Sequence, residues 1–184
     1  MIALLNFAAF QVGWFAAVLG AANGLPWAGP LVIALAIGLH LKIVRRPRTE
    51  LTLILICGLI GAAMDSVLVA LGWVAYPGGS IVDNAAPYWI VAMWMLFATT
   101  LNISLGWLKP RKFVGAIFGL VGGPLAYYTG FKLGGIEFVN FDAAIVSLGI
   151  GWAVVVPLLL VLAERFNGVD ERAPRASTAL AGEG

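Results

Sequence analysis

Asp65 is the residue best placed to do chemistry, because it is an acid inside a long apolar stretch. If that stretch crosses a membrane, an ionised side chain costs about 2.5–3.5 kcal/mol, so Asp65 must face water or the protein interior. Counting about 1.5 Å per residue along each span puts Tyr127 and Trp94 at nearly the same depth. The three residues form a candidate pocket with aromatic walls. Asp65 is interpreted as a proton relay, a cation site or a substrate anchor, or as an acid whose hydrogen bonds only lock helices together.

A second group of polar side chains lies nearer the other end of the apolar stretches. It consists of Gln11, His40, Thr99 and Asn102. Buried amides and hydroxyls in lipid need partners, and interhelical hydrogen bonds between them contribute about 0.6–2 kcal/mol. Thr99 and Asn102 are three positions apart and share a helix face. We interpret this group as interhelical contacts, with His40 as a base as the functional alternative.

Glycines repeat every four residues at Gly115, Gly119 and Gly123, which makes a smooth helix face where another backbone can approach closely. This face is a candidate packing surface within the chain or between two copies of it. Pro124 follows directly, and its missing N–H donor predicts a kink or a short unwound segment.

The elements that must position these residues are apolar helices. Hydrophobic residues make up 61% of the 184 positions and charged residues only 11%, whereas soluble domains carry about 25% charged residues. A membrane-spanning helix needs about 20 mostly apolar residues. The sequence therefore predicts an all-α, polytopic membrane bundle of about six transmembrane helices, over 2–22, 26–43, 50–73, 87–108, 113–131 and 142–163. We expect a six-helix domain over 1–164 and a disordered cytoplasmic tail over 165–184.

The basic residues predict how the bundle is oriented. All eleven Lys and Arg residues except Lys132 lie at the end of the second span or just after it, after the fourth span, or at the C-terminal end. Cytoplasmic loops carry an excess of Lys and Arg. Both termini are thus predicted to be cytoplasmic.

Composition also excludes several kinds of site. The chain has one histidine, His40, and one cysteine, Cys57, so neither a histidine metal cluster nor an intrachain disulfide is possible. Phosphate-binding and dinucleotide-binding fingerprints are absent from the sequence, so we expect no cofactor and no metal. A net charge of +2 with clustered basic residues is typical of a topology signal rather than of nucleic-acid binding.

Spans three to five also resemble a known family. Its features are Asp65, Pro87-Tyr88-Trp89, Phe97-Ala98-Thr99-Thr100-Leu101 and Gly122-Gly123-Pro124-Leu125-Ala126-Tyr127. They are similar to the bacterial inner-membrane family catalogued as domain of unknown function 2878, over about residues 2–163. The resemblance implies a location in the bacterial inner membrane. Members of this family are often encoded near fatty-acid methyltransferases and flavin oxidoreductases, so the resemblance also implies a link to lipid modification.

Three functions are compatible with these features. The first is an accessory or acyl-binding component of lipid or fatty-acid modification, with membrane lipid as its partner. The second is a small proton-coupled transporter that uses Asp65. The third is an assembly partner for another membrane protein or for a second copy of the chain.

Overall fold

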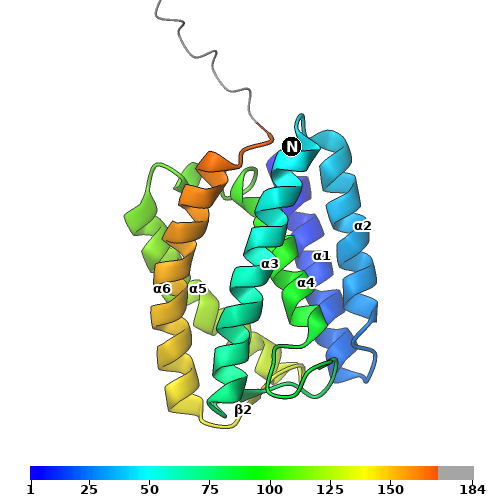
Figure 1. Cartoon of the computed structure of the whole chain (residues 1–184), viewed down its shortest axis with the longest axis vertical. Coiled ribbons are helices and arrows are strands. Elements are labelled where there is room, and N and C mark those ends of the chain that lie inside the picture. The colour runs from blue at the N-terminus through cyan, green and yellow to red at the C-terminus, as the bar shows by residue number, and fades with distance from the viewer. Residues whose placement is uncertain (170–184) are drawn as a thin grey trace, which may run out of the picture.

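The computed structural model describes residues 1–169, and this part of the chain is an all-α bundle, as predicted (Figure 1). Its long elements are α1 (Ile2–Ala22), α2 (Ala28–Ile43), α3 (Pro47–Ala70), α4 (Tyr88–Leu101), α5 (Lys112–Lys132) and α6 (Phe141–Arg165). Short elements are the 3-10 helix η1 (Gly106–Leu108) and the strands β1 (Val74–Ala75) and β2 (Glu137–Phe138). Of the expected tail, residues 170–184 lie outside the described part.

Four helices, α1, α3, α5 and α6, are long and apolar enough to cross a membrane, so the number of spans by this measure is about four rather than six. The other two helices are apolar but shorter, with 16 residues in α2 and 14 in α4. The expected span over 87–108 is wrong in its extent. Its helix ends at Leu101, because the backbone N–H groups of Ile103 and Leu105 both turn back to the carbonyl oxygen of Thr100.

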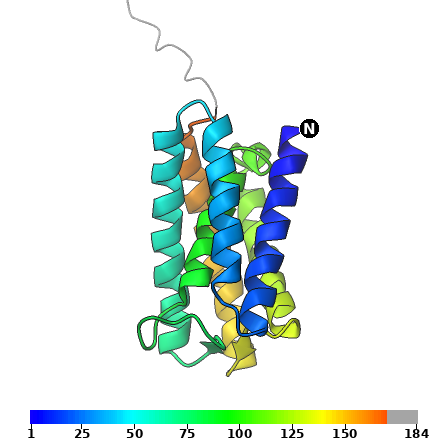
Figure 2. The ribbon, with the colours of Figure 1, turned by 90° about the vertical axis from the view of Figure 1, so that its right-hand side faces the viewer.

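The helices run alternately up and down, and Met1 lies at the same end of the bundle as the segment that follows α6 (Figures 1 and 2). We call this the terminal end. The basic residues between α2 and α3 and those around η1 lie at this end as well, at the tops of their helices in Figure 1. Met1 and residues 166–169 thus lie on one side of the bundle. Which side of the membrane this is stays a prediction.

The opposite end, which we call the strand end, is closed by β1 and β2. The two strands pair antiparallel, with Val74 opposite Phe138 and Ala75 opposite Glu137. The chain reverses after α3 at Gly72, whose φ of 66° is left-handed and suits a residue without Cβ. This reversal brings the residues after α3 back over the end of the helix.

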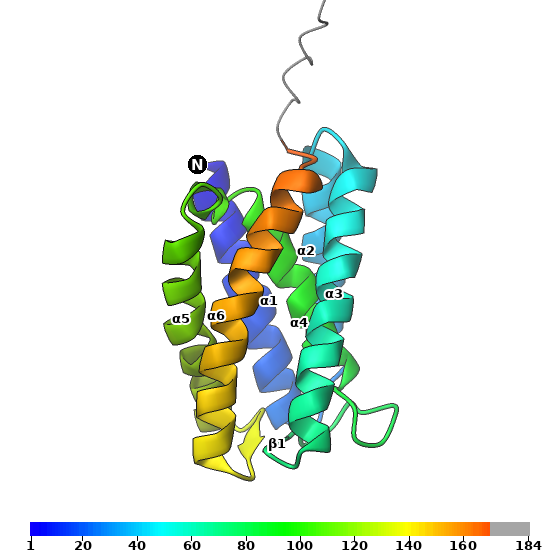
Figure 3. The same ribbon diagram turned by 60° about the vertical axis from the view of Figure 1, so that its left-hand side comes forward.

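Helices α1 to α4 pack together, and the α5–α6 hairpin joins them through contacts of α6 with α3 and α4 (Figure 3). The glycine face of α5 makes the hairpin tight. A Cβ on Gly115 would lie 2.7 Å from Leu160 Cδ1, and one on Gly119 or Gly123 would collide with Trp152. Because α6 covers this face, it cannot be the contact between two copies that the glycine spacing suggested. A kink or a short unwound segment was expected at Pro124. The α5 helix is continuous there, so it contains no unwound segment.

Candidate functional site

Asp65 is fully buried near the strand end of α3, and its carboxylate accepts three hydrogen bonds. Tyr127 Oη on α5 donates to Oδ1 over 2.6 Å, and Trp94 Nε1 on α4 donates to Oδ2 over 2.7 Å. Tyr76 Oη, from the segment after β1, donates to Oδ1 over 2.7 Å. The structure therefore brings Asp65, Tyr127 and Trp94 together and adds a third donor. These donors give both carboxylate oxygens partners that burial would otherwise deny them.

Tyr76 was not among the candidate residues taken from the sequence. It reaches Asp65 because the chain turns back at Gly72 and then pairs β1 with β2. Burial, followed by the nearby Asp65 charge, raises the pKa of the Tyr76 phenol well above its ordinary value. The phenol therefore keeps its proton at neutral pH and serves as a donor.

The donors to Asp65 also form part of an aromatic wall. The Trp94 ring stacks on Trp152 of α6, with centroids 4.5 Å apart and planes 16° apart. Phe97 contacts both rings edge to face, at 6.5 Å from Trp94 and 5.5 Å from Trp152. Trp94 fits against α3 only because Gly61 has no side chain there. The Asp65 hydrogen bonds thus fix the positions of two rings, Trp94 and Tyr127, that face the centre of the bundle.

Beside this wall lies an apolar cavity of about 170 Å³ between α1, α4, α5 and α6. This is larger than an engineered apolar cavity of about 150 Å³ that stays dry and binds benzene. No charged side chain of the described residues lines it. Aromatic rings form much of its wall: Phe10, Trp14, Trp94, Phe97, Phe118, Tyr127 and Trp152.

The cavity continues into a cleft between α1 and α5, which we call the α1–α5 cleft. It shares Phe10, Trp14, Gly122 and Ala126 with the cavity and is completed by Gln11, Phe15, Leu125 and Thr129. At its rim, Phe15 is 44% and Leu125 60% exposed, so the cleft opens on the outer, apolar face of the bundle. Gln11, expected among the interhelical polar contacts, instead lines this opening.

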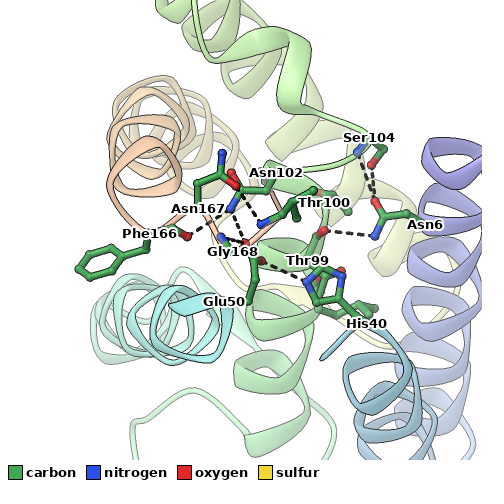
Figure 4. A network of polar contacts seen from close by, with 12 residues as sticks. Asn6, His40, Glu50, Thr99, Thr100, Asn102, Ser104, Phe166, Asn167 and Gly168 are labelled. Carbon is green, nitrogen blue, oxygen red and sulfur yellow. Dashed lines mark hydrogen bonds and ion pairs between the residues drawn. The ribbon is translucent and has the colours of Figure 1, made fainter. Parts of the chain in front are cut away.

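A second polar cluster lies at the terminal end, around Glu50 (Figure 4). Glu50 is fully buried, and its Oε2 lies 3.1 Å from His40 Nε2. Its Oε1 accepts hydrogen bonds from Asn102 Nδ2 over 2.7 Å and from the backbone nitrogen of Gly168 over 2.8 Å. Lys109 Nζ donates to Asn102 Oδ1 over 2.9 Å. His40 and Asn102 therefore belong to one buried network that links α2, α3, α4 and the segment after α6.

Thr99 does not join this network through its side chain, which donates to Leu96 O within α4. Its backbone carbonyl accepts from Asn6 Nδ2 over 3.1 Å, and Asn6 Oδ1 in turn accepts from Ser104 Oγ over 2.7 Å. This short chain of bonds, at the right of Figure 4, attaches α1 to the end of α4.

A comparison with models of protein families shows which family the chain belongs to. The model described as Protein of unknown function (DUF2878) matches residues 3–158. The chain belongs to this family. A comparison with curated proteins and one with solved structures found no match. Membership of DUF2878 and the apolar helices agree with a membrane protein.

In this DUF2878 member, sequence reasoning missed Glu50 and Trp152 as well as Tyr76. Glu50 was passed over because it starts a predicted span next to basic residues, where an acid normally faces water. Trp152 was passed over because a tryptophan in an apolar helix is unremarkable by itself. The glycines that lie against it, Gly119 and Gly123, belong to α5.

Proposed function

We propose that the protein holds the hydrocarbon part of a membrane lipid in the cavity between α1, α4, α5 and α6, as an accessory component of lipid modification in the bacterial inner membrane. The observation that carries the proposal is the uncharged cavity, lined by Phe10, Trp94 and Trp152 among others, which continues into the α1–α5 cleft. Ligand sites are typically concave and apolar with few polar groups.

The packing of the helices supports lateral entry of a lipid. Helix α1 packs on α2 and α4, whereas α5 packs chiefly on α6, so the space between α1 and α5 is bounded by side chains rather than by a close helix contact. An acyl chain entering there would pass from lipid to an apolar site, and none of the described residues that line this path is charged. Each methylene group buried would contribute up to about 0.8 kcal/mol relative to water.

Gly122 offers a direct test of the cavity. It lines both the cavity and the cleft, and a Cβ at this position would meet only Phe118 Cε1, at 3.9 Å. Gly122→Leu should therefore fill the lipid site without disturbing the packing of α5 on α6. Gly38→Leu is the matched control, because Gly38 is on α2 with no neighbouring side chain or backbone within 4 Å.

The measurement is saturable binding of a fluorescent long-chain fatty acid to delipidated protein in detergent, together with mass spectrometry of the lipid that co-purifies. Gly122→Leu should weaken binding at least about tenfold, which corresponds to the loss of roughly two buried methylene groups. Gly38→Leu should bind as the wild type does. Wild-type protein that binds no lipid, together with unchanged membrane fatty acids in a deletion strain, would overturn the proposal.

The hydrogen bonds of Asp65 support a positioning role in this site. Both carboxylate oxygens accept bonds from protein donors, and two of those donors, Trp94 and Tyr127, line the cavity. Proton-coupled transport through Asp65 and a role as an assembly partner stay predictions that no contact among the described residues favours.

A further inference from the structure

One residue that lines the cavity has a buried N–H without a partner. Trp152 lines the cavity, and its Nε1 is buried without a hydrogen-bond partner among the described residues. Nearly all buried polar groups in native proteins are hydrogen-bonded, and each exception needs a physical explanation. By contrast, the donors of Tyr127 and Trp94 in the same wall are both used by Asp65.

A second unused polar group lies at the entrance. Gln11 lines the α1–α5 cleft, is half-buried, and makes no hydrogen bond to another residue of the described chain. Its carboxamide both donates and accepts. Gln11 and Trp152 lie near the middle of α1 and of α6, at the depth where lipid offers no polar partner.

These two groups restrict the chemistry of the ligand. In a diacyl lipid the ester carbonyls lie at the level of the polar headgroups, outside the hydrocarbon core. Such a lipid would fill the cavity with methylene groups and leave the Trp152 N–H without a partner. The absence of charged side chains among the described lining residues also disfavours an ionised group at this depth.

We propose that the cavity selects a neutral lipid with a carbonyl or hydroxyl oxygen inside its hydrocarbon part, and that this oxygen accepts a hydrogen bond from Trp152 Nε1. The inference rests on the proposed function and specifies its ligand. Gln11 meets the same oxygen at the cleft entrance as the lipid passes in from the membrane, and Trp152 receives it at the inner wall.

A matched pair of probes isolates the oxygen. Delipidated protein in detergent is titrated with a long-chain ketone whose carbonyl is near mid-chain, and with the alkane of the same length, each competing against a fluorescent fatty acid. The wild type should bind the ketone about three- to tenfold more tightly than the alkane, as expected for one hydrogen bond in a buried site.

The N–H is then removed while the ring is kept. Replacement of Trp152 by benzothienylalanine, in which sulfur takes the place of Nε1–H, should abolish the preference for the ketone and leave alkane binding unchanged. Trp152→Phe is a second variant that also lacks the donor. Trp27→Phe is the control, because Trp27 is an indole that is 54% exposed and lines neither the cavity nor the cleft.

The outcomes separate the two proposals. Binding of both probes with equal affinity to the wild type would overturn the selection of an oxygen and leave the lipid site intact. A preference for the ketone that survives in both Trp152 variants would overturn the role of Trp152. Binding of neither probe to folded wild-type protein would overturn the lipid site itself.

Discussion

Glu50 Oε1 lies 2.8 Å from the backbone nitrogen of Gly168, so an acid at the start of α3 holds the segment that follows α6. Arg46 completes the attachment, because its backbone N–H donates to Gly168 O over 3.0 Å. The approach is too close for a side chain at position 168, since a Cβ there would lie 2.6 Å from Glu50 Cγ. The two halves of the chain are thereby joined at the terminal end.

Replacing Glu50 should destabilise the folded protein. Glu50→Gln removes the buried charge and replaces one acceptor oxygen with N–H₂. The contact with His40 Nε2 or the bonds from Asn102 Nδ2 and Gly168 N are thereby weakened. We expect the free energy of unfolding to fall by about 1–3 kcal/mol, measured by tryptophan fluorescence during thermal unfolding in detergent. Glu137→Gln is the control, because Glu137 is exposed in β2. Unfolding of both variants at the wild-type temperature would contradict this role for Glu50.

Asp65→Asn should lower stability in a similar way. The amide would present N–H₂ to at least one of the donors Tyr76, Trp94 and Tyr127, which now share two carboxylate oxygens. A loss of about 1–3 kcal/mol is expected, whereas Asp83→Asn in the exposed loop after β1 should have no effect. An Asp65→Asn protein as stable as the wild type but inactive in uptake assays would favour the transporter hypothesis instead.

The glycine face of α5 should tolerate no methyl group at its centre. In Gly119→Ala the new Cβ would meet the backbone of Trp152, which can move only if α5 and α6 separate. Overpacking of this kind costs about 1–3 kcal/mol, seen as a lower unfolding temperature. Gly122→Ala, on the same helix but with open space beside it, should unfold close to the wild type. Equal unfolding temperatures for the two alanine variants would show that the hairpin is loosely packed.

The orientation of the bundle can be tested with single cysteines. Cys57 is buried, so it should not react with a membrane-impermeant maleimide and need not be removed. Ser80→Cys at the strand end should be labelled in intact cells, and Pro110→Cys at the terminal end should be labelled only after the membrane is opened. The reverse pattern would show that the positive-inside rule fails for this chain.

The fold class could be predicted from the sequence because the length of each apolar stretch and the basic residues between the stretches are local features of the chain. Depth counting also placed Asp65, Tyr127 and Trp94 at one level, and the structure brings these side chains within hydrogen-bond distance. Whether the group is functional stays a prediction. Tyr76 could not be found in this way, because its position depends on the turn at Gly72 and on the pairing of two very short strands.

Other contacts were hidden because they depend on which helices become neighbours. The spacing of Gly115, Gly119 and Gly123 indicates close approach of a helix but does not identify that helix as α6. Burial of Glu50 requires Asn102 and Gly168, which are 52 and 118 positions away in the chain. Trp152 Nε1 lacks a partner only because of how the helices pack around it, so no local sequence pattern could predict this.

The position of α4 explains why rules of span length misjudge it. With 14 residues it is about 21 Å long, well short of the roughly 30 Å of a hydrocarbon core. It is packed by α1, α2, α3 and α6, so neighbouring protein insulates most of it from acyl chains. A helix surrounded by other helices need not match the thickness of the bilayer. The polar turn at Asn102 is buried by protein and bonded to Glu50 and Lys109, so it does not depend on water for its hydrogen bonds. Its length, not its hydropathy, excludes α4 from the helices that could cross a membrane, and its packing is that of a helix in a soluble core.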